Sequence, residues 1–175
     1  MKRTITACLA LAIATIAQAG DVSIPSSISS SDAFVLSGNL DTLRYSDNTF
    51  ITVLPDVSRD AEFPTVTVLA VGYARGNDYG KVNIGLDCIV DMDHPSSDPD
   101  FQQRVDIYSY YLNSWVTVSD TQVTFGQRER LTMSPIYSAG FIHPLTCQVK
   151  MRVSWVGTDF MSRVRIDQLI WRFSD

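Results

Sequence analysis

The chain has 175 residues, a formal net charge of −5 and 45% hydrophobic residues. This is the length of one domain with its own core, and the mixed composition excludes a disordered or fibrous protein. The acidic balance argues against nucleic-acid binding, because a phosphate footprint needs clustered Lys and Arg.

The N-terminus has the three parts of a secretory signal peptide. Lys2 and Arg3 precede an uncharged apolar stretch over residues 5–16, and the small-x-small sequence of residues 17–19 follows. The apolar stretch is too short to span a membrane, which takes about 20 residues. We expect cleavage after Ala19 and a secreted or periplasmic protein that does not span the membrane. Cleavage leaves 156 of the 175 residues and removes two positive charges, which changes the net charge from −5 to −7.

The cysteine content predicts one disulfide. Once Cys8 has left with the signal peptide, only Cys88 and Cys147 remain. Two cysteines in an exported chain most simply pair with each other, here between two strand-like segments. Two unpaired buried thiols are the alternative. A zinc site is not expected, because the sequence has no CxxC motif and only two histidines.

The hydrophobic pattern along the rest of the chain has a period of two. Residues 20–32 are Ser-rich and are expected to form a flexible lead-in. Asn39 is placed to cap a short helical turn over residues 40–43. The expected strands cover residues 33–36, 50–54, 64–74, 81–86, 105–111, 115–118, 121–125, 130–133, 148–155 and 163–173. The strands over 115–118 and 121–125 are expected to form a hairpin around Ser119 and Asp120.

About nine or ten short strands without a long amphipathic helix predict an all-β fold, an antiparallel β-sandwich of the jelly-roll kind. We expect it to be a single domain over residues 33–175. In the last strand Val164 and Ile166 have the opposite parity to Leu169 and Trp171. A β-bulge near Asp167 would bring both pairs to the same face.

No sequence motif indicates catalysis. There is no GxSxG, HExxH, P-loop or GxGxxG pattern. The two glutamates, Glu62 and Glu129, lie in turn-like segments and not where a buried general acid would be expected. We therefore expect no enzyme. A hydrolase that uses two aspartates is the remaining catalytic alternative.

Acidic residues are most concentrated at Asp91, Asp93, Asp98 and Asp100. Carboxylates together with loop carbonyls are ligands that calcium accepts, so this segment is a candidate calcium site. It lacks the glycine and the final glutamate of an EF-hand loop. The alternative is a solvated loop between strands. No other cofactor is expected.

Aromatic residues gather at Tyr108, Tyr110 and Trp115. The tyrosines alternate with Val105 and Ile107, so they are expected to face away from the core. Aromatic rings on a sheet surface can stack on sugars. The alternative is packing among the side chains of the sheet.

The sequence also resembles a known kind of module. The stretch from Ser37 to Val53, the run from Val105 to Trp115 and above all the ending Val164-Arg165-Ile166-Asp167-Gln168-Leu169-Ile170-Trp171 are similar to a jelly-roll-like module found in secreted bacterial proteins. In broader outline the chain resembles carbohydrate-binding, discoidin-like modules. The resemblance implies a β-sandwich and an extracellular setting, and it implies no catalytic residue.

Two functions follow as hypotheses. The first is a non-catalytic binding module for a glycan or a cell-surface protein. The second is a structural or assembly protein of the cell exterior whose strand edges pair with partners.

Overall fold

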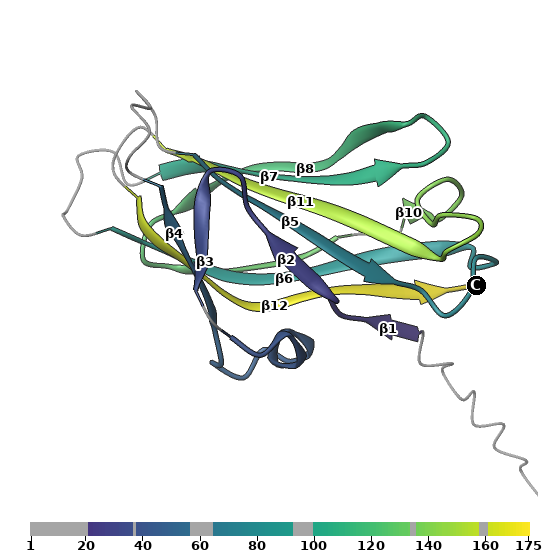
Figure 1. The fold of residues 1–175 in the computed structure, drawn as a ribbon. Coiled ribbons are helices and arrows are strands. Elements are labelled where there is room, and N and C mark those ends of the chain that lie inside the picture. Colours follow the sequence, from purple (N-terminus) through teal and green to yellow (C-terminus); the bar gives the residue numbers. More distant parts are fainter. Residues whose placement is uncertain (1–20, 37, 57–64, 93–99, 134–135, 158–160) are drawn as a thin grey trace, which may run out of the picture.

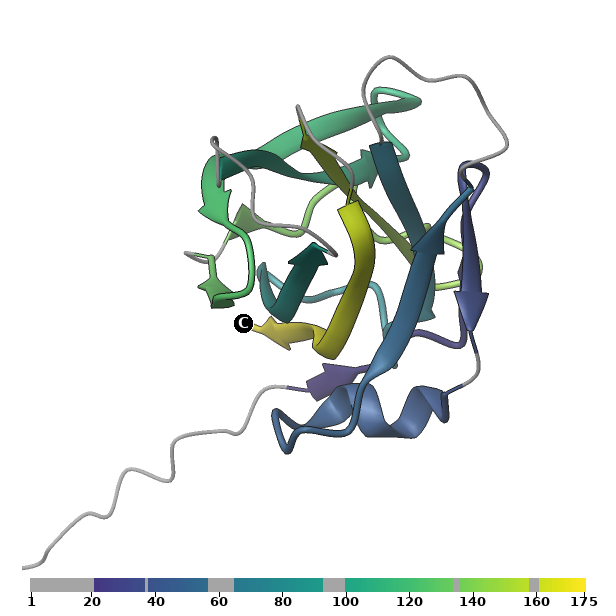
Figure 2. The same cartoon turned by 90° about the vertical axis from the view of Figure 1, so that its left-hand side faces the viewer.

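The computed structural model describes residues 21–36, 38–56, 65–92, 100–133, 136–157 and 161–175. The predicted signal peptide, residues 1–19, lies outside these ranges. The described chain folds into two β-sheets packed face to face, in which every strand pairing is antiparallel (Figures 1 and 2). The predicted antiparallel β-sandwich is therefore confirmed.

One sheet has seven strands in the order β10-β6-β12-β4-β3, with β9 also pairing with β6 and β1 with β12. Its strands are β1 (Asp21–Ser23), β3 (Ala33–Leu36), β4 (Ile51–Pro55), β6 (Lys81–Met92), β9 (Arg128–Thr132), β10 (Ile136–Tyr137) and β12 (Met161–Ser174). The other sheet has five strands in the order β2-β5-β11-β7-β8. These are β2 (Ser27–Ser29), β5 (Thr65–Tyr73), β7 (Asp100–Ser109), β8 (Ser114–Thr124) and β11 (Gln148–Gly157).

The described residues thus form twelve strands, more than the nine or ten expected. β1, β2 and β10 have only two or three residues each, too few for an alternating pattern to appear in the sequence. Two of them lie in the predicted lead-in over residues 20–32. β1 pairs with β12, and β2 pairs with β5, so this segment contributes a strand to each sheet.

The predicted hairpin around Ser119 and Asp120 is wrong. These residues lie inside β8, which continues past them along β7, with Val105 opposite Ser119 and a register shift directly after Val105. β8 is an edge strand of its sheet. Polar residues in the middle of an edge strand can face solvent. In the sequence they therefore look the same as the polar residues of a turn.

Two local predictions are confirmed. Leu40–Arg44 forms a 3₁₀ turn, η1, whose cap is Asn39: its Oδ1 accepts from the backbone N–H of Asp41 at 3.0 Å. In β12 the pairing with β6 shifts register between Ile166 and Gln168, which is the expected bulge.

The core lies between the inner faces of the two sheets. Along β11 it contains Val149, Met151, Val153 and Trp155, each at most 1% exposed, as the alternation predicts. β12 contributes residues from both sides of its bulge, so the bulge is what keeps this strand amphipathic over its whole length.

The predicted disulfide is wrong, because Cys88 and Cys147 are both free. The Cys88 thiol donates to Gln103 Oε1 at 3.2 Å, and the same oxygen accepts from Trp155 Nε1 at 2.7 Å. Cys88 therefore lies close to Trp155. Trp155 is eight residues after Cys147 in the sequence (155 − 147), and eight residues of extended strand span about 26 Å. Cys147 is thus far from Cys88. A disulfide needs Cα atoms within about 7 Å of each other. Burial of Cys88 raises the pKa of its thiol to about 12.

Within the described ranges, no helix is both long enough and apolar enough to cross a membrane.

Candidate functional site

The three predicted aromatic residues lie together on the outer face of the five-stranded sheet. Tyr108 stands opposite Trp115 across β7 and β8, and Tyr110 follows it two residues later on the same side. The ring centroid of Tyr108 is 5.3 Å from that of Trp115 and 5.1 Å from that of Tyr110. We call Tyr108, Tyr110 and Trp115 the aromatic strip. The sequence therefore predicted correctly that the tyrosines face outward, whereas their role in binding stays a prediction.

The rings of the strip do not lie in one plane. Tyr108 is tilted by 74° from Trp115 and by 78° from Tyr110, so neighbouring rings meet edge to face. Two cations from β11 lie over them: Lys150 Nζ is 5.2 Å from the Tyr108 centroid, and the Arg152 guanidinium is 4.8 Å from the Trp115 centroid. The strip thus combines aromatic surface with the N–H donors of Lys150 and Arg152.

A buried carboxylate holds this arrangement in place. Asp106 faces outward between β8 and β11 and yet is only 1% exposed. It accepts from Arg104 Nε and Thr117 Oγ1, both at 2.8 Å, and from Arg152 Nη2 at 2.7 Å. Burial alone would raise the pKa of Asp106, but the hydrogen bonds from the two arginines outweigh it and lower the pKa. Asp106 therefore stays ionised and fixes Arg152 over Trp115.

A pocket of about 460 Å³ opens at one end of the sandwich. This end carries the β7–β8 hairpin and the C-terminus in Figure 1. We call it the end pocket. It is lined by Asn77, Tyr110, Tyr111, Gly140, Ile142 and Pro144. Because Tyr110 belongs to both, the pocket adjoins the aromatic strip. Tyr111 is 86% exposed, so a ligand can reach its ring from the pocket.

The walls of the end pocket are tied together by specific contacts. Asn77 Nδ2 donates to the backbone oxygen of Pro144 at 2.8 Å, and the backbone N–H of Tyr110 donates to the oxygen of Gly140 at 2.6 Å. Gly140 has a φ of +86°, and a Cβ at this position would lie 2.9 Å from the Cβ of Tyr111. A glycine is therefore required where the wall passes the hairpin. The His143 ring packs edge to face against Tyr110 at 4.8 Å, from the side of the β10–β11 connection.

Of the four predicted calcium ligands, the structure describes the side chain of Asp91 alone. Asp91, at the end of β6, accepts from Arg165 Nε at 2.7 Å and Arg163 Nε at 2.9 Å. Burial would raise the pKa of Asp91, and these arginines lower it overall. Asp93 and Asp98 lie outside the described residues, and only the backbone of Asp100 is described. The described residues hold no cluster of three or more potential metal ligands. The calcium site stays a prediction.

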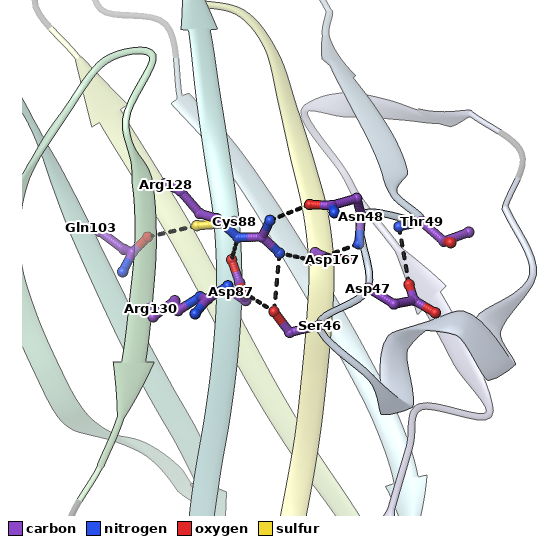
Figure 3. Close-up of polar contacts among 10 residues, drawn as sticks. All are labelled: Ser46, Asp47, Asn48, Thr49, Asp87, Cys88, Gln103, Arg128, Arg130 and Asp167. Carbon is purple, nitrogen blue, oxygen red and sulfur yellow. Dashed lines mark hydrogen bonds and ion pairs between the residues drawn. The ribbon is translucent and has the colours of Figure 1, made fainter.

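A second polar cluster lies on the outer face of the seven-stranded sheet (Figure 3). Arg128 Nε donates to Asp87 at 2.7 Å, and Arg128 Nη2 pairs with Asp167. The Ser46 hydroxyl donates to Asp87 at 2.5 Å, and the backbone N–H of Asn48 donates to Asp167 at 3.2 Å. Asp87 and Asp167 are at most 1% exposed. Arg128 thus joins two buried carboxylates and fastens the segment after η1 to the sheet.

Sequence reasoning missed this cluster and the role of Asp106. The charged residues in both clusters stand at alternating positions of strands, which normally indicates a solvated face. Only the pairing of strands that are far apart in sequence brings these charges together. Arg152 of β11, for example, stands opposite Asp106 of β7. The pattern of a single strand carries no such signal.

Known protein structures share this fold. No family model and no curated protein matches the chain in sequence. A xylan-binding domain of carbohydrate-binding module family 22 superposes with a TM-score of 0.51 at 12% identity, over 84% of this chain and 86% of that chain. The C-terminal family 22 module of Clostridium thermocellum Xyn10B gives 0.50 at 12% identity, with the same coverage of 84% and 86%. Amino acids in the cleft of that module have a role in ligand binding.

Longer proteins contain the same fold as one part. An agarase matches with a TM-score of 0.51 at 13% identity, over 86% of this chain and 24% of that chain. The N-terminal CBM22-1–GH10 modules of the Clostridium thermocellum xylanase match with 0.51 at 8% identity, over 85% and 26%. The chain therefore spans about a quarter of the length of these enzymes. At such identities the likeness establishes a jelly-roll-like β-sandwich of the kind seen in carbohydrate-binding modules.

Proposed function

We propose that this protein is a non-catalytic glycan-binding module of the periplasm or the cell exterior, in which the aromatic strip and the end pocket together hold the glycan. The observation that carries the proposal is the end pocket, about 460 Å³ in volume and walled by two tyrosines. A concave site that combines aromatic surface with a few polar groups is the usual form of a small-ligand site. The shared fold of carbohydrate-binding modules supports this assignment.

Each part of the site has a role in the proposal. The exposed ring of Tyr111 stacks on a sugar, and Asn77 offers its amide to hydroxyl groups. Tyr110 donates its hydroxyl to Gln148 Oε1 at 3.0 Å. Burial, followed by the nearby Tyr108 and Tyr73, raises the Tyr110 pKa to about 12, so this hydroxyl remains a donor at neutral pH. Export through the predicted signal peptide would bring the module to extracellular glycans.

Calorimetry against a panel of plant and algal polysaccharides tests the proposal. Tyr111→Ala is expected to weaken binding by roughly tenfold or more, because a stacked aromatic contact contributes about 1–3 kcal/mol by alanine substitution. Tyr45→Ala is the matched control, since Tyr45 is also an exposed tyrosine but follows η1, outside the end pocket. Equal loss in both variants, or no binding to any member of the panel, would contradict the proposal.

A second candidate function, assembly through a strand edge, is favoured by β3. This strand ends the order of the seven-stranded sheet, and its Phe34, Val35 and Leu36 are all exposed. An apolar edge strand can pair with another chain. Size-exclusion chromatography with light scattering tests this function. An oligomer that Val35→Lys dissociates would support it, and a monomer at all concentrations would contradict it.

A further inference from the structure

The outer face of the five-stranded sheet carries three positive side chains near the aromatic strip and two described carboxylates, Asp106 and Asp120, of which Asp120 stands opposite Arg104 in the pairing of β7 with β8. Arg104, Lys150 and Arg152 lie on this face, near the aromatic strip. Both arginines are paired with the single buried carboxylate of Asp106, at 2.8 Å from Arg104 Nε and 2.7 Å from Arg152 Nη2. The four hydrogen bonds that Asp106 accepts from Arg104, Arg152 and Thr117 use both of its oxygens. Asp106 is therefore fully engaged and is not available to Lys150.

Lys150 itself has aromatic neighbours in place of an acid. Its ammonium lies 5.2 Å from the Tyr108 ring centroid and 5.8 Å from that of Tyr110. Among the ion pairs of the described residues none involves Lys150, although the side chain is half-buried. The ring faces partly compensate its charge. A half-buried ammonium still gains from a counter-ion, because it has already lost part of its hydration.

The preference for an anion comes from the charge of Lys150. In the edge-to-face contacts of Tyr108 the ring edge is directed at the face of the neighbouring ring. The ammonium is therefore the group that favours an anionic oxygen over a neutral hydroxyl. The negative charge of the rest of the chain acts weakly at this spot, since salt screens exposed charges beyond about 8 Å.

We infer that the glycan held by this face carries an anionic group, a carboxylate or a sulfate, and that Lys150 selects it. This inference rests on the proposed function and deepens it by naming the class of ligand. The anionic group would bind where the Lys150 ammonium meets the two tyrosines, and the neutral part of the sugar chain would extend into the end pocket. Lys150 is then a specificity-determining residue, and Tyr111 contributes to the binding of charged and neutral chains alike.

Matched glycans that differ only in charge test the inference. Oligogalacturonate is compared with its methyl ester for the carboxylate, and a sulfated galactan with its desulfated form for the sulfate, each by calorimetry. For one of the two pairs, the anionic form is expected to bind roughly tenfold or more tightly, as a charge-assisted hydrogen bond implies. The pair that shows this difference identifies the anionic group.

Three variants assign the preference to Lys150. Lys150→Met is expected to remove the preference, so that this variant binds the anionic and neutral forms of the pair with affinities within about twofold of each other. Lys150→Arg should keep the preference, which shows that the charge and not the fold is responsible. Lys81→Met is the matched control and should behave as wild type, because Lys81 starts β6 in the other sheet.

The outcomes separate the two proposals. Equal affinity for the anionic and neutral forms of both pairs overturns the inference alone, and so does a preference that survives in Lys150→Met. Failure of the protein to bind any of the four glycans or any member of the polysaccharide panel overturns the inference together with the proposed function.

Discussion

Tyr110 and Gly140 define how the end pocket is built at the level of single residues. The backbone N–H of Tyr110 donates to the Gly140 oxygen, so the β7–β8 hairpin and the β10–β11 connection touch at this point. Gly140 has no side chain and a positive φ, which lets the backbone pass close to Tyr111. The pocket therefore depends on a residue without any functional group of its own.

Gly140→Ala is expected to destabilise the protein by about 2–4 kcal/mol and to weaken glycan binding. The new Cβ would lie 2.9 Å from the Tyr111 Cβ in a backbone conformation that side chains disfavour. Gly126→Ala is the control, because Gly126 also has a positive φ, +73°, but no atom within 4 Å of an added Cβ. Gly126→Ala should lower the free energy of unfolding by about 1 kcal/mol. The free energy of unfolding of both variants, measured with urea, checks this prediction. Equal losses of stability in the two variants would contradict the close contact between Gly140 and Tyr111.

At the residue scale, the sequence predicted which way side chains face but not what they meet. The alternation around Val105 and Ile107 placed Tyr108 and Tyr110 correctly on the outer face. The pairing of Cys88 with Cys147 was wrong, because the expectation used only the presence of two cysteines in an exported chain. The place of Cys88 within β6 and of Cys147 just before β11 decides the matter, and a sequence gives no strand register.

At the scale of elements, the Arg128 cluster joins the segment after η1 to the seven-stranded sheet. Asn48 and Ser46 come from that segment, whereas Asp87 is on β6 and Asp167 is at the bulge of β12 (Figure 3). Asp167 has the same parity as Arg163 and Arg165, and it lies at the register shift of β12, where its carboxylate pairs with Arg128. Arg165, two residues before Asp167 on β12, pairs instead with Asp91 of β6.

Arg128→Met is expected to lower the free energy of unfolding by about 3–5 kcal/mol, because it leaves Asp167 buried without its arginine partner and removes one partner of Asp87. Arg130→Met is the matched control. Arg130 also pairs with Asp87, at 3.0 Å, but its side chain is 65% exposed, so its loss should cost less than about 1 kcal/mol. Denaturant unfolding monitored by tryptophan fluorescence gives both values. If both variants lost a similarly small amount of the free energy of unfolding, the cluster would not stabilise the fold.

Elements with a long, regular hydrophobic pattern or a local cap could be predicted from the sequence. Elements that depend on pairing with strands far along the chain could not. β11 and the capped turn η1 follow from local alternation and from Asn39. β1, β2 and the continuous β8 follow from pairing with strands far along the chain, which local patterns do not record. The end pocket belongs to the second kind, because three separate connections form it.

At the scale of the whole molecule, ionised aspartates held by arginines stabilise both sheets. Asp87, Asp91 and Asp106 each have a pKa below the ordinary value, because hydrogen bonds from arginines outweigh the effect of burial. A group whose pKa is lower in the folded state contributes its full stability above its unfolded pKa, near 4, and loses it as the pH falls through the folded pKa.

We therefore expect the free energy of unfolding to change little between about pH 7 and pH 5 and to fall steeply below about pH 4. Urea unfolding at a series of pH values measures this dependence. Asp106→Asn should reduce the slope in the acidic range, since one of the three aspartates no longer titrates. Stability that is constant or rises down to about pH 2 would contradict the ionised pairs.

The central claim is that one continuous site, formed by the aromatic strip and the end pocket, binds a glycan. Amide chemical-shift mapping by nuclear magnetic resonance during titration with an oligosaccharide from the panel tests it most directly. The claim predicts shifts confined to the β7–β8 hairpin, the start of β11, the connection through Gly140 and Ile142, and Asn77. Shifts centred on β3 or on Asp91, or no shifts at saturating glycan, would contradict it.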